Sequence, residues 1–129
     1  MVERLIQTLQ ALASPPEVQL ARFPDFVARA DELALDFDDA LRLVYDCPQI
    51  QLEPTQRRYL DRLNRYLDER SGRTDNPFWT EAAIRQSAEW ATLRELARDA
   101  LTSLDAPLDV PPPADAAYVR SQGMPPRSA

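Results

Sequence analysis

Apolar side chains recur every three or four positions along most of the chain, which is the spacing of helices that bury one face. Residues 2–13, for example, place Leu5, Leu9 and Leu12 on one stripe. The sequence lacks both sustained apolar–polar alternation and the Asn-Gly or Asp-Gly pairs of tight hairpins, so no strand is predicted. The pattern predicts four main helices, over residues 2–13, 31–46, 54–71 and 88–104, and short ones at 17–22 and from Trp79 onward.

Proline, glycine and serine residues mark where these helices start and stop. Ser14-Pro15-Pro16 ends the first helix, since a proline pushes the residue before it out of the α region. Pro54 opens the third main helix within its first turn, and Gly72 follows its last turn. Ser87 is expected to cap the last helix. The predicted fold class is all-α: a small bundle of four main amphipathic helices plus one or two short helices, with a Pro-rich C-terminal tail.

The composition of the chain changes near its C-terminal end. Residues 105–129 contain six prolines and few large apolar residues, which is typical of an extended or disordered segment. We therefore predict a helical domain over residues 1–104 and a Pro-rich extended or disordered tail over 105–129. Four residues would hold this tail on the body if it packs there: Leu108, Val110, Tyr118 and Val119.

Composition and charge narrow the classes of function. The 129 residues carry a net charge of −6, which disfavours nucleic acid and membrane surfaces as partners because both are anionic. The chain has no His, which excludes His-based triads and His metal ligands. Its single Cys47 cannot close an intramolecular disulfide, and its two Gly cannot build a glycine-rich phosphate loop. No secretory signal pattern opens the sequence, so a cytoplasmic protein is expected. No cofactor is expected either.

The predicted second main helix, residues 31–46, is strongly acidic. On a helical wheel its apolar residues, such as Leu33, Phe37 and Leu41, fall on one side. The other side carries six carboxylates within about 160°, and Leu35 and Leu43 interrupt them. We call this side the acidic face. It consists of Asp31, Glu32, Leu35, Asp36, Asp38, Asp39, Leu43 and Asp46.

Three interpretations of the acidic face stay open. Asp31, Glu32, Asp36 and Asp39 could bind a hard cation, but the segment lacks the glycine and spaced ligands of a calcium loop. A solvated helix face, partly neutralised by the strip Arg58, Arg62 and Arg65 of the next helix, is the plainest account. A docking face for a basic protein is the third, since carboxylates around apolar anchors speed association and disfavour wrong partners.

Two segments give the chain an overall resemblance to a class of proteins. They are "FPDFVARADELALDFDDA" at 23–40 and "FWTEAAIRQSAEWATLRELARDAL" at 78–101. In build the chain resembles small, acidic, all-helical bacterial immunity or antitoxin-like proteins, and the resemblance covers about residues 15–104. It implies a non-enzymatic protein that neutralises a basic toxin or effector. No functional residue can be carried over from it.

The predicted function is therefore a protein-binding protein, with an immunity or inhibitor role and the acidic face as the partner-binding site. A scaffold module that acts through its Pro-rich tail is the alternative, and a small metal-dependent enzyme ranks third. The aromatic residues Phe78, Trp79 and Trp90 could line a ligand pocket. Aromatic residues at helical spacing are more often core, so we expect these three to be buried.

Overall fold

The computed structural model describes residues 2–72 and 75–109, and these residues form helices and connecting loops with no strand. The all-α prediction is confirmed. The helices in chain order are α1 (Val2–Ala13), α2 (Pro16–Ala21), α3 (Arg29–Tyr45), α4 (Pro54–Arg70), the 3-10 helix η1 (Pro77–Trp79), α5 (Glu81–Gln86) and α6 (Ala88–Ser103). Within this part of the chain, no helix combines the length and the apolar character that a membrane span requires.

Local sequence explains most of the helix boundaries. Pro54 is the first residue of α4, where a missing N–H costs nothing. Gly72 has a φ of 88° just after the end of α4, a left-handed conformation that glycine adopts without a steric penalty. Thr80 and Ser87 cap α5 and α6, accepting hydrogen bonds from the backbone N–H groups of Ala83 and Trp90 over 3.1 Å each. The predicted Ser87 cap is confirmed.

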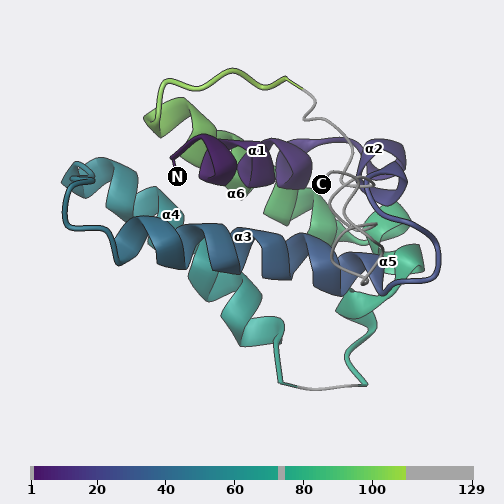
Figure 1. Ribbon diagram of the computed structural model, residues 1–129. Helices are drawn as coiled ribbons and strands as arrows, with labels where there is room; N and C mark the ends of the chain where they lie inside the picture. The colour runs from purple at the N-terminus through teal and green to yellow at the C-terminus, as the bar shows by residue number, and fades with distance from the viewer. Residues whose placement is uncertain (1, 73–74, 110–129) are drawn as a thin grey trace, which may run out of the picture.

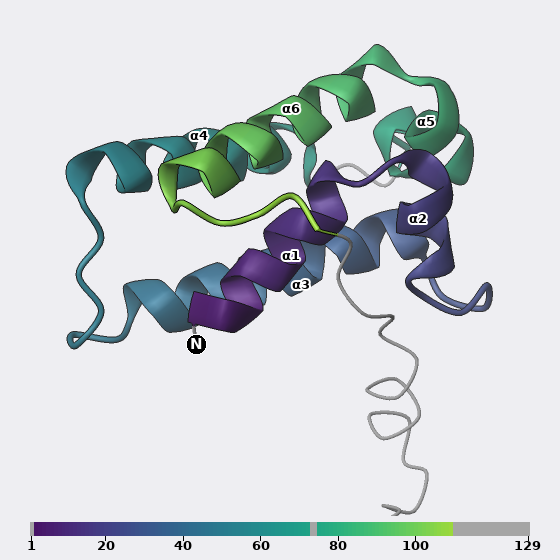
Figure 2. The same ribbon diagram turned by 90° about the horizontal axis from the view of Figure 1, so that it is seen from above.

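The main helices lie in two layers (Figures 1 and 2). One layer holds α1 and α3 and the other holds α4 and α6, and α1 packs against α6 to join the layers. The short helices α2 and α5 contact each other at one end of the bundle. By contrast, α3 and α4 share no extended backbone contact, although both lie within the described residues. The bundle is thus open between these two helices.

The core runs along the contact between α1 and α6. Leu5, Leu9 and Leu12 of α1 are fully buried, as are Leu93 and Leu101 of α6. Near the start of α6, the Trp90 ring stacks on Phe78 with ring centroids 4.9 Å apart, and its indole N–H donates to the Phe78 carbonyl over 2.7 Å. The prediction that Phe78 and Trp90 are core residues is confirmed.

A buried arginine holds the short helices against α6. The Arg94 guanidinium donates to the side-chain oxygen of Gln19 over 3.1 Å and to the backbone carbonyl of Ile84. Gln19 in turn donates to the carbonyl of Leu12 over 2.9 Å. Arg94 is only 9% exposed. This chain of hydrogen bonds connects α1, α2, α5 and α6. Its side chains, Gln19 and Arg94, are polar, so the spacing of apolar residues does not predict that they are buried.

The first residues of the predicted tail come after α6 and contact α1. Ala106 packs against the core, and the carbonyl of Pro107 accepts a hydrogen bond from the Gln10 side chain over 3.1 Å. Leu108, which was expected to anchor the tail if it packs, is instead 59% exposed. The other three expected anchors, at positions 110, 118 and 119, lie outside the described residues.

Candidate functional site

A groove of about 560 Å³ lies between α3 and α4. We call it the α3–α4 groove. One wall comes from α3, the other from α4 and the residues that follow it, and Trp79 of η1 contributes at one end. It is lined by Asp31, Ala34, Leu35, Asp38, Arg42, Asn64, Leu67, Asp68, Ser71, Gly72 and Trp79.

The groove exists because α3 and α4 each direct their buried stripe elsewhere. α3 packs on α1, and α4 packs on α6. Side chains at the margins of both stripes therefore remain open to solvent between the two helices. Leu35, one of the two apolar residues of the acidic face, is 51% exposed there. Together with Ala34, Leu67 and Trp79 it gives the groove an apolar surface.

Carboxylates outnumber cations along the groove. Asp31 and Asp38 come from α3 and Asp68 from α4, whereas Arg42 is the one basic residue in the lining. Arg42 forms an ion pair with Asp38 at 3.1 Å, which leaves Asp31 and Asp68 without a basic residue in the lining. Burial, and then the neighbouring carboxylate of Glu32, raise the pKa of Asp31. A cation entering the groove would oppose both effects, because it stabilises the ionised form of the Asp31 carboxyl group.

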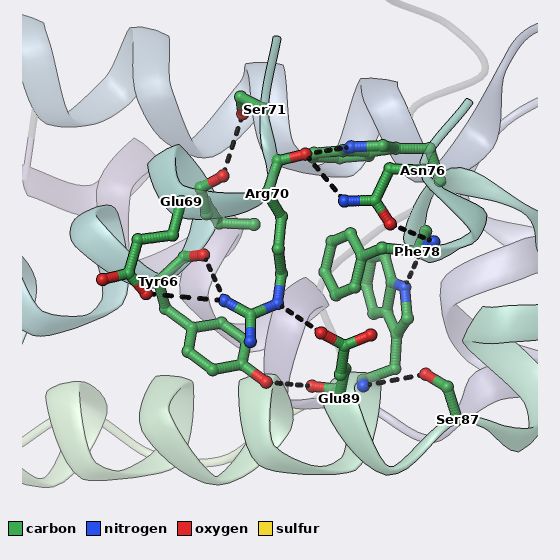
Figure 3. A network of polar contacts seen from close by, with 11 residues as sticks. Tyr66, Glu69, Arg70, Ser71, Asn76, Phe78, Ser87 and Glu89 are labelled. Atoms are coloured by element: carbon green, nitrogen blue, oxygen red, sulfur yellow. Dashed lines mark hydrogen bonds and ion pairs between the residues drawn. The ribbon is translucent and has the colours of Figure 1, made fainter. Parts of the chain in front are cut away.

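Arg70 fixes the end of the groove where α4 stops (Figure 3). Its guanidinium lies 3.5 Å from the centroid of the Tyr66 ring and forms an ion pair with Glu89 of α6 at 2.8 Å. Its backbone carbonyl accepts two hydrogen bonds, from the Trp79 indole over 2.7 Å and from the Asn76 side chain over 3.3 Å. This network ties η1, α4 and α6 together and positions Trp79 in the groove lining.

A polar contact joins α3 to α4 near the C-terminal end of α3. The Tyr45 hydroxyl group donates to the Asp61 carboxylate over 2.6 Å, and the Arg57 guanidinium covers the Tyr45 ring at 3.7 Å from its centroid. Arg57 also pairs with Asp61 at 3.8 Å. Burial, followed by the hydrogen bond and the negative charge of Asp61, raises the pKa of Tyr45. The groove is therefore held at both ends by polar contacts.

The structure divides the acidic face into separate groups. Asp31, Leu35 and Asp38 line the groove. Asp36 lies outside the groove. It forms an ion pair with Arg22, the C-cap residue of α2, at 3.9 Å. Burial raises the pKa of Asp36, opposed by Arg22 and Arg4 and reinforced by Glu32 and Asp39.

The remaining residues of the acidic face stay outside both the groove and the Arg22 contact. Leu43 is 46% exposed, and Asp46 is exposed at the C-cap of α3. Neither Leu35 nor Leu43 is covered by any part of the chain that the structure describes. In the same residues, no three His, Cys, Asp or Glu side chains gather closely enough to hold a metal ion.

Two expectations about neighbouring residues need correction. Arg58, Arg62 and Arg65 do not neutralise the acidic face, because none of them forms an ion pair within residues 2–72 and 75–109. They lie on the far side of α4, whereas the cations that pair with α3 carboxylates are Arg22 and Arg42. Trp79, which was expected in the core, is half-buried and lines the groove.

Sequence reasoning missed the α4 side of the groove. Asn64, Asp68 and Ser71 lie beside the buried stripe of their own helix, and nothing in their local sequence distinguishes them from a solvated helix face. Only the separation of α3 from α4 makes them part of a groove. No family model, curated protein or solved structure matches this chain, so its function is inferred from the groove and the charges around it.

Proposed function

We propose that this protein binds a basic partner protein through the α3–α4 groove, without catalysing a reaction. The most specific form of the proposal is an immunity or inhibitor protein that neutralises a basic toxin or effector in the bacterial cytoplasm. The observation that carries it is the pairing of an exposed apolar surface, around Leu35 and Trp79, with an excess of carboxylates along the same groove.

The chemistry of the groove defines what it would hold. An aliphatic or aromatic side chain of the partner would contact Leu35 and Trp79, and flanking Arg or Lys side chains would reach Asp31 and Asp68. Buried apolar anchors supply most of the affinity of such interfaces. The carboxylates raise the association rate and select against acidic proteins. Because two of the carboxylates have no cation in the lining, a basic segment gains charge pairs without breaking existing ones.

A pair of matched variants tests the proposal. Asp31→Arg with Asp68→Arg reverses two charges in the groove, whereas Asp39→Arg with Asp99→Arg reverses two exposed charges outside it. Both pairs change the net charge by the same amount. The partner would be captured from an extract of the native cells on the immobilised wild-type protein, identified, purified and then measured by surface plasmon resonance.

We expect the groove variant to associate at least about tenfold more slowly, with a flatter salt dependence, and the control variant to stay close to wild type. Leu35→Ala should instead raise the dissociation rate while leaving the melting temperature unchanged, because Leu35 is half exposed. If the partner is a toxin, the wild-type protein should inhibit its activity and the groove variant should not. Equal rate constants for the two charge-reversal variants would contradict a role for the groove.

A further inference from the structure

We infer that Arg58, Arg62 and Arg65 of α4, the arginine strip, form a second docking surface that takes an acidic segment of a partner protein. The three residues are spaced i, i+4 and i+7, so they share one helix face and span about 10 Å along its axis. All three are exposed. They lie on the opposite side of α4 from its buried residues Leu60, Leu63 and Leu67.

The charge of the strip is not compensated locally. Asp61, the nearest carboxylate along the helix, pairs with Arg57 and accepts the Tyr45 hydrogen bond. Glu69, which follows Arg65 by one turn, pairs with Arg70 at 3.7 Å. None of the three strip residues forms an ion pair in the part of the chain that the structure describes. An acidic protein thus presents a concentrated positive surface at this place.

The strip is also hollowed, so that an incoming carboxylate would meet several guanidinium groups at once. A depression of about 410 Å³ is lined by Pro54, Arg57, Arg58, Asp61, Arg62 and Arg65. Its walls are mainly arginine side chains, and the Tyr59 ring supports one of them, with the Arg62 guanidinium 5.3 Å from its centroid. Planar guanidinium groups bind carboxylates through two parallel hydrogen bonds, which makes such a surface suited to Asp and Glu side chains.

An acidic protein segment fits the strip better than a nucleic acid does. The net charge of −6 repels a long phosphate backbone, and the strip offers only three arginines before the carboxylates of Asp68 and Glu69 are reached. A helix with carboxylates at i, i+4 and i+7 would place one beside each arginine. The strip faces away from the α3–α4 groove, so this inference does not depend on the proposed function.

Fluorescence anisotropy of a short, labelled, glutamate-rich peptide tests the inference on the full-length protein. The test variant is Arg58→Glu with Arg62→Glu, and the matched control is Arg85→Glu with Arg98→Glu, which changes the net charge equally at exposed positions elsewhere. We expect saturable binding at low salt that the test variant weakens at least about tenfold and the control less than about threefold. Asp31→Arg with Asp68→Arg should leave peptide binding intact.

Several results would overturn the inference. Equal losses in the two arginine variants would show that only bulk charge matters. Tighter binding of a single-stranded RNA oligonucleotide or of inorganic phosphate than of the peptide would assign the strip to phosphate groups. Absence of saturable peptide binding would rule out an acidic partner segment. So would a strip reversal that changes only the self-association of the protein, measured by analytical ultracentrifugation. Melting curves of each variant show whether it is folded. If the Arg58→Glu, Arg62→Glu variant is unfolded, the milder Arg58→Gln, Arg62→Gln variant is used in its place.

Discussion

Arg94 carries a positive charge into the interior and gives its hydrogen bonds to neutral groups. The acceptors are the amide oxygen of Gln19 and the carbonyl of Ile84. Burial, and then the nearby charge of Arg98, lower the pKa of Arg94, while Glu17 opposes the change. Arg94 supplies hydrogen-bond donors to these two buried oxygens, which offsets the cost of burying its guanidinium group.

Arg94→Ala should therefore lower the free energy of unfolding by about 1–3 kcal/mol, since it leaves buried acceptors on α2 and α5 without a donor. Urea unfolding followed by circular dichroism measures this. Arg98→Ala is the matched control on the exposed side of the same helix and should change stability by less than about 0.5 kcal/mol. Equal effects for the two variants would mean that the Arg94 hydrogen bonds contribute nothing net.

Tyr45 makes the stability of the protein depend on alkaline pH. Its folded-state pKa lies above the ordinary value of 10.0, so the folded protein holds the phenolic proton more tightly than the unfolded chain. This contribution is complete below about pH 10 and is lost as the pH rises above it. We expect the melting temperature of the wild type to fall more steeply than that of Tyr45→Phe as the pH rises above about 10.

Tyr59→Phe serves as the control for this prediction. The hydroxyl group of Tyr59 makes no hydrogen bond in the described part of the chain, so this variant measures the effect of removing a tyrosine hydroxyl group that has no such partner. A Tyr45→Phe profile that follows the wild type would show that the Asp61 hydrogen bond does not hold the phenolic proton in the folded state.

At the scale of single helices, the sequence was a reliable guide. The period of the apolar residues located every main helix, and α3 differs from its predicted range only by starting at Arg29 and ending at Tyr45. Proline and serine fixed helix starts because their effects are local to the backbone. The same wheel placed Leu35 outside the buried stripe, and this residue is half exposed in the structure.

The groove could not be predicted in the same way, because it depends on which helices pack together. A wheel shows that Asp36 and Asp38 both lie opposite the apolar stripe, but not that one meets Arg22 and the other Arg42. Nor does it show that α4 turns its buried residues to α6 and leaves Asp68 facing α3. These are contacts between distant segments, on which the local pattern carries no information.

The Ser87 cap at the N-terminus of α6 should contribute measurably to the stability of the protein. Ser87→Ala removes the hydroxyl group that accepts from the Trp90 N–H and should cost about 1 kcal/mol of unfolding free energy. Ser87→Asp should retain most of it, because a carboxylate can accept the same hydrogen bond and interacts favourably with the helix dipole. Chemical denaturation of the three proteins measures both effects, and an unaltered Ser87→Ala midpoint would show that the cap is energetically silent.

For the molecule as a whole, the segment after α6 contacts both the core and α1 and should stabilise the packing of the two layers. Ala106 packs on the core, and Pro107 receives the Gln10 hydrogen bond from α1. A chain that ends at Leu104 should therefore melt at a lower temperature than one that ends at Asp109, by several degrees for a loss of about 1–2 kcal/mol. Differential scanning calorimetry compares the two, and identical transitions would place residues 105–109 outside the cooperative unit.

The two indole groups described above give the protein a pair of built-in reporters for nuclear magnetic resonance. The Trp90 indole proton is fully buried against the Phe78 carbonyl, so its exchange with deuterium requires the bundle to open globally. The Trp79 indole proton bonds to the Arg70 carbonyl at the edge of the groove and can exchange when that corner alone loosens. Slow exchange at Trp90 would follow the stability of the fold, while protection at Trp79 would rise when the groove is filled.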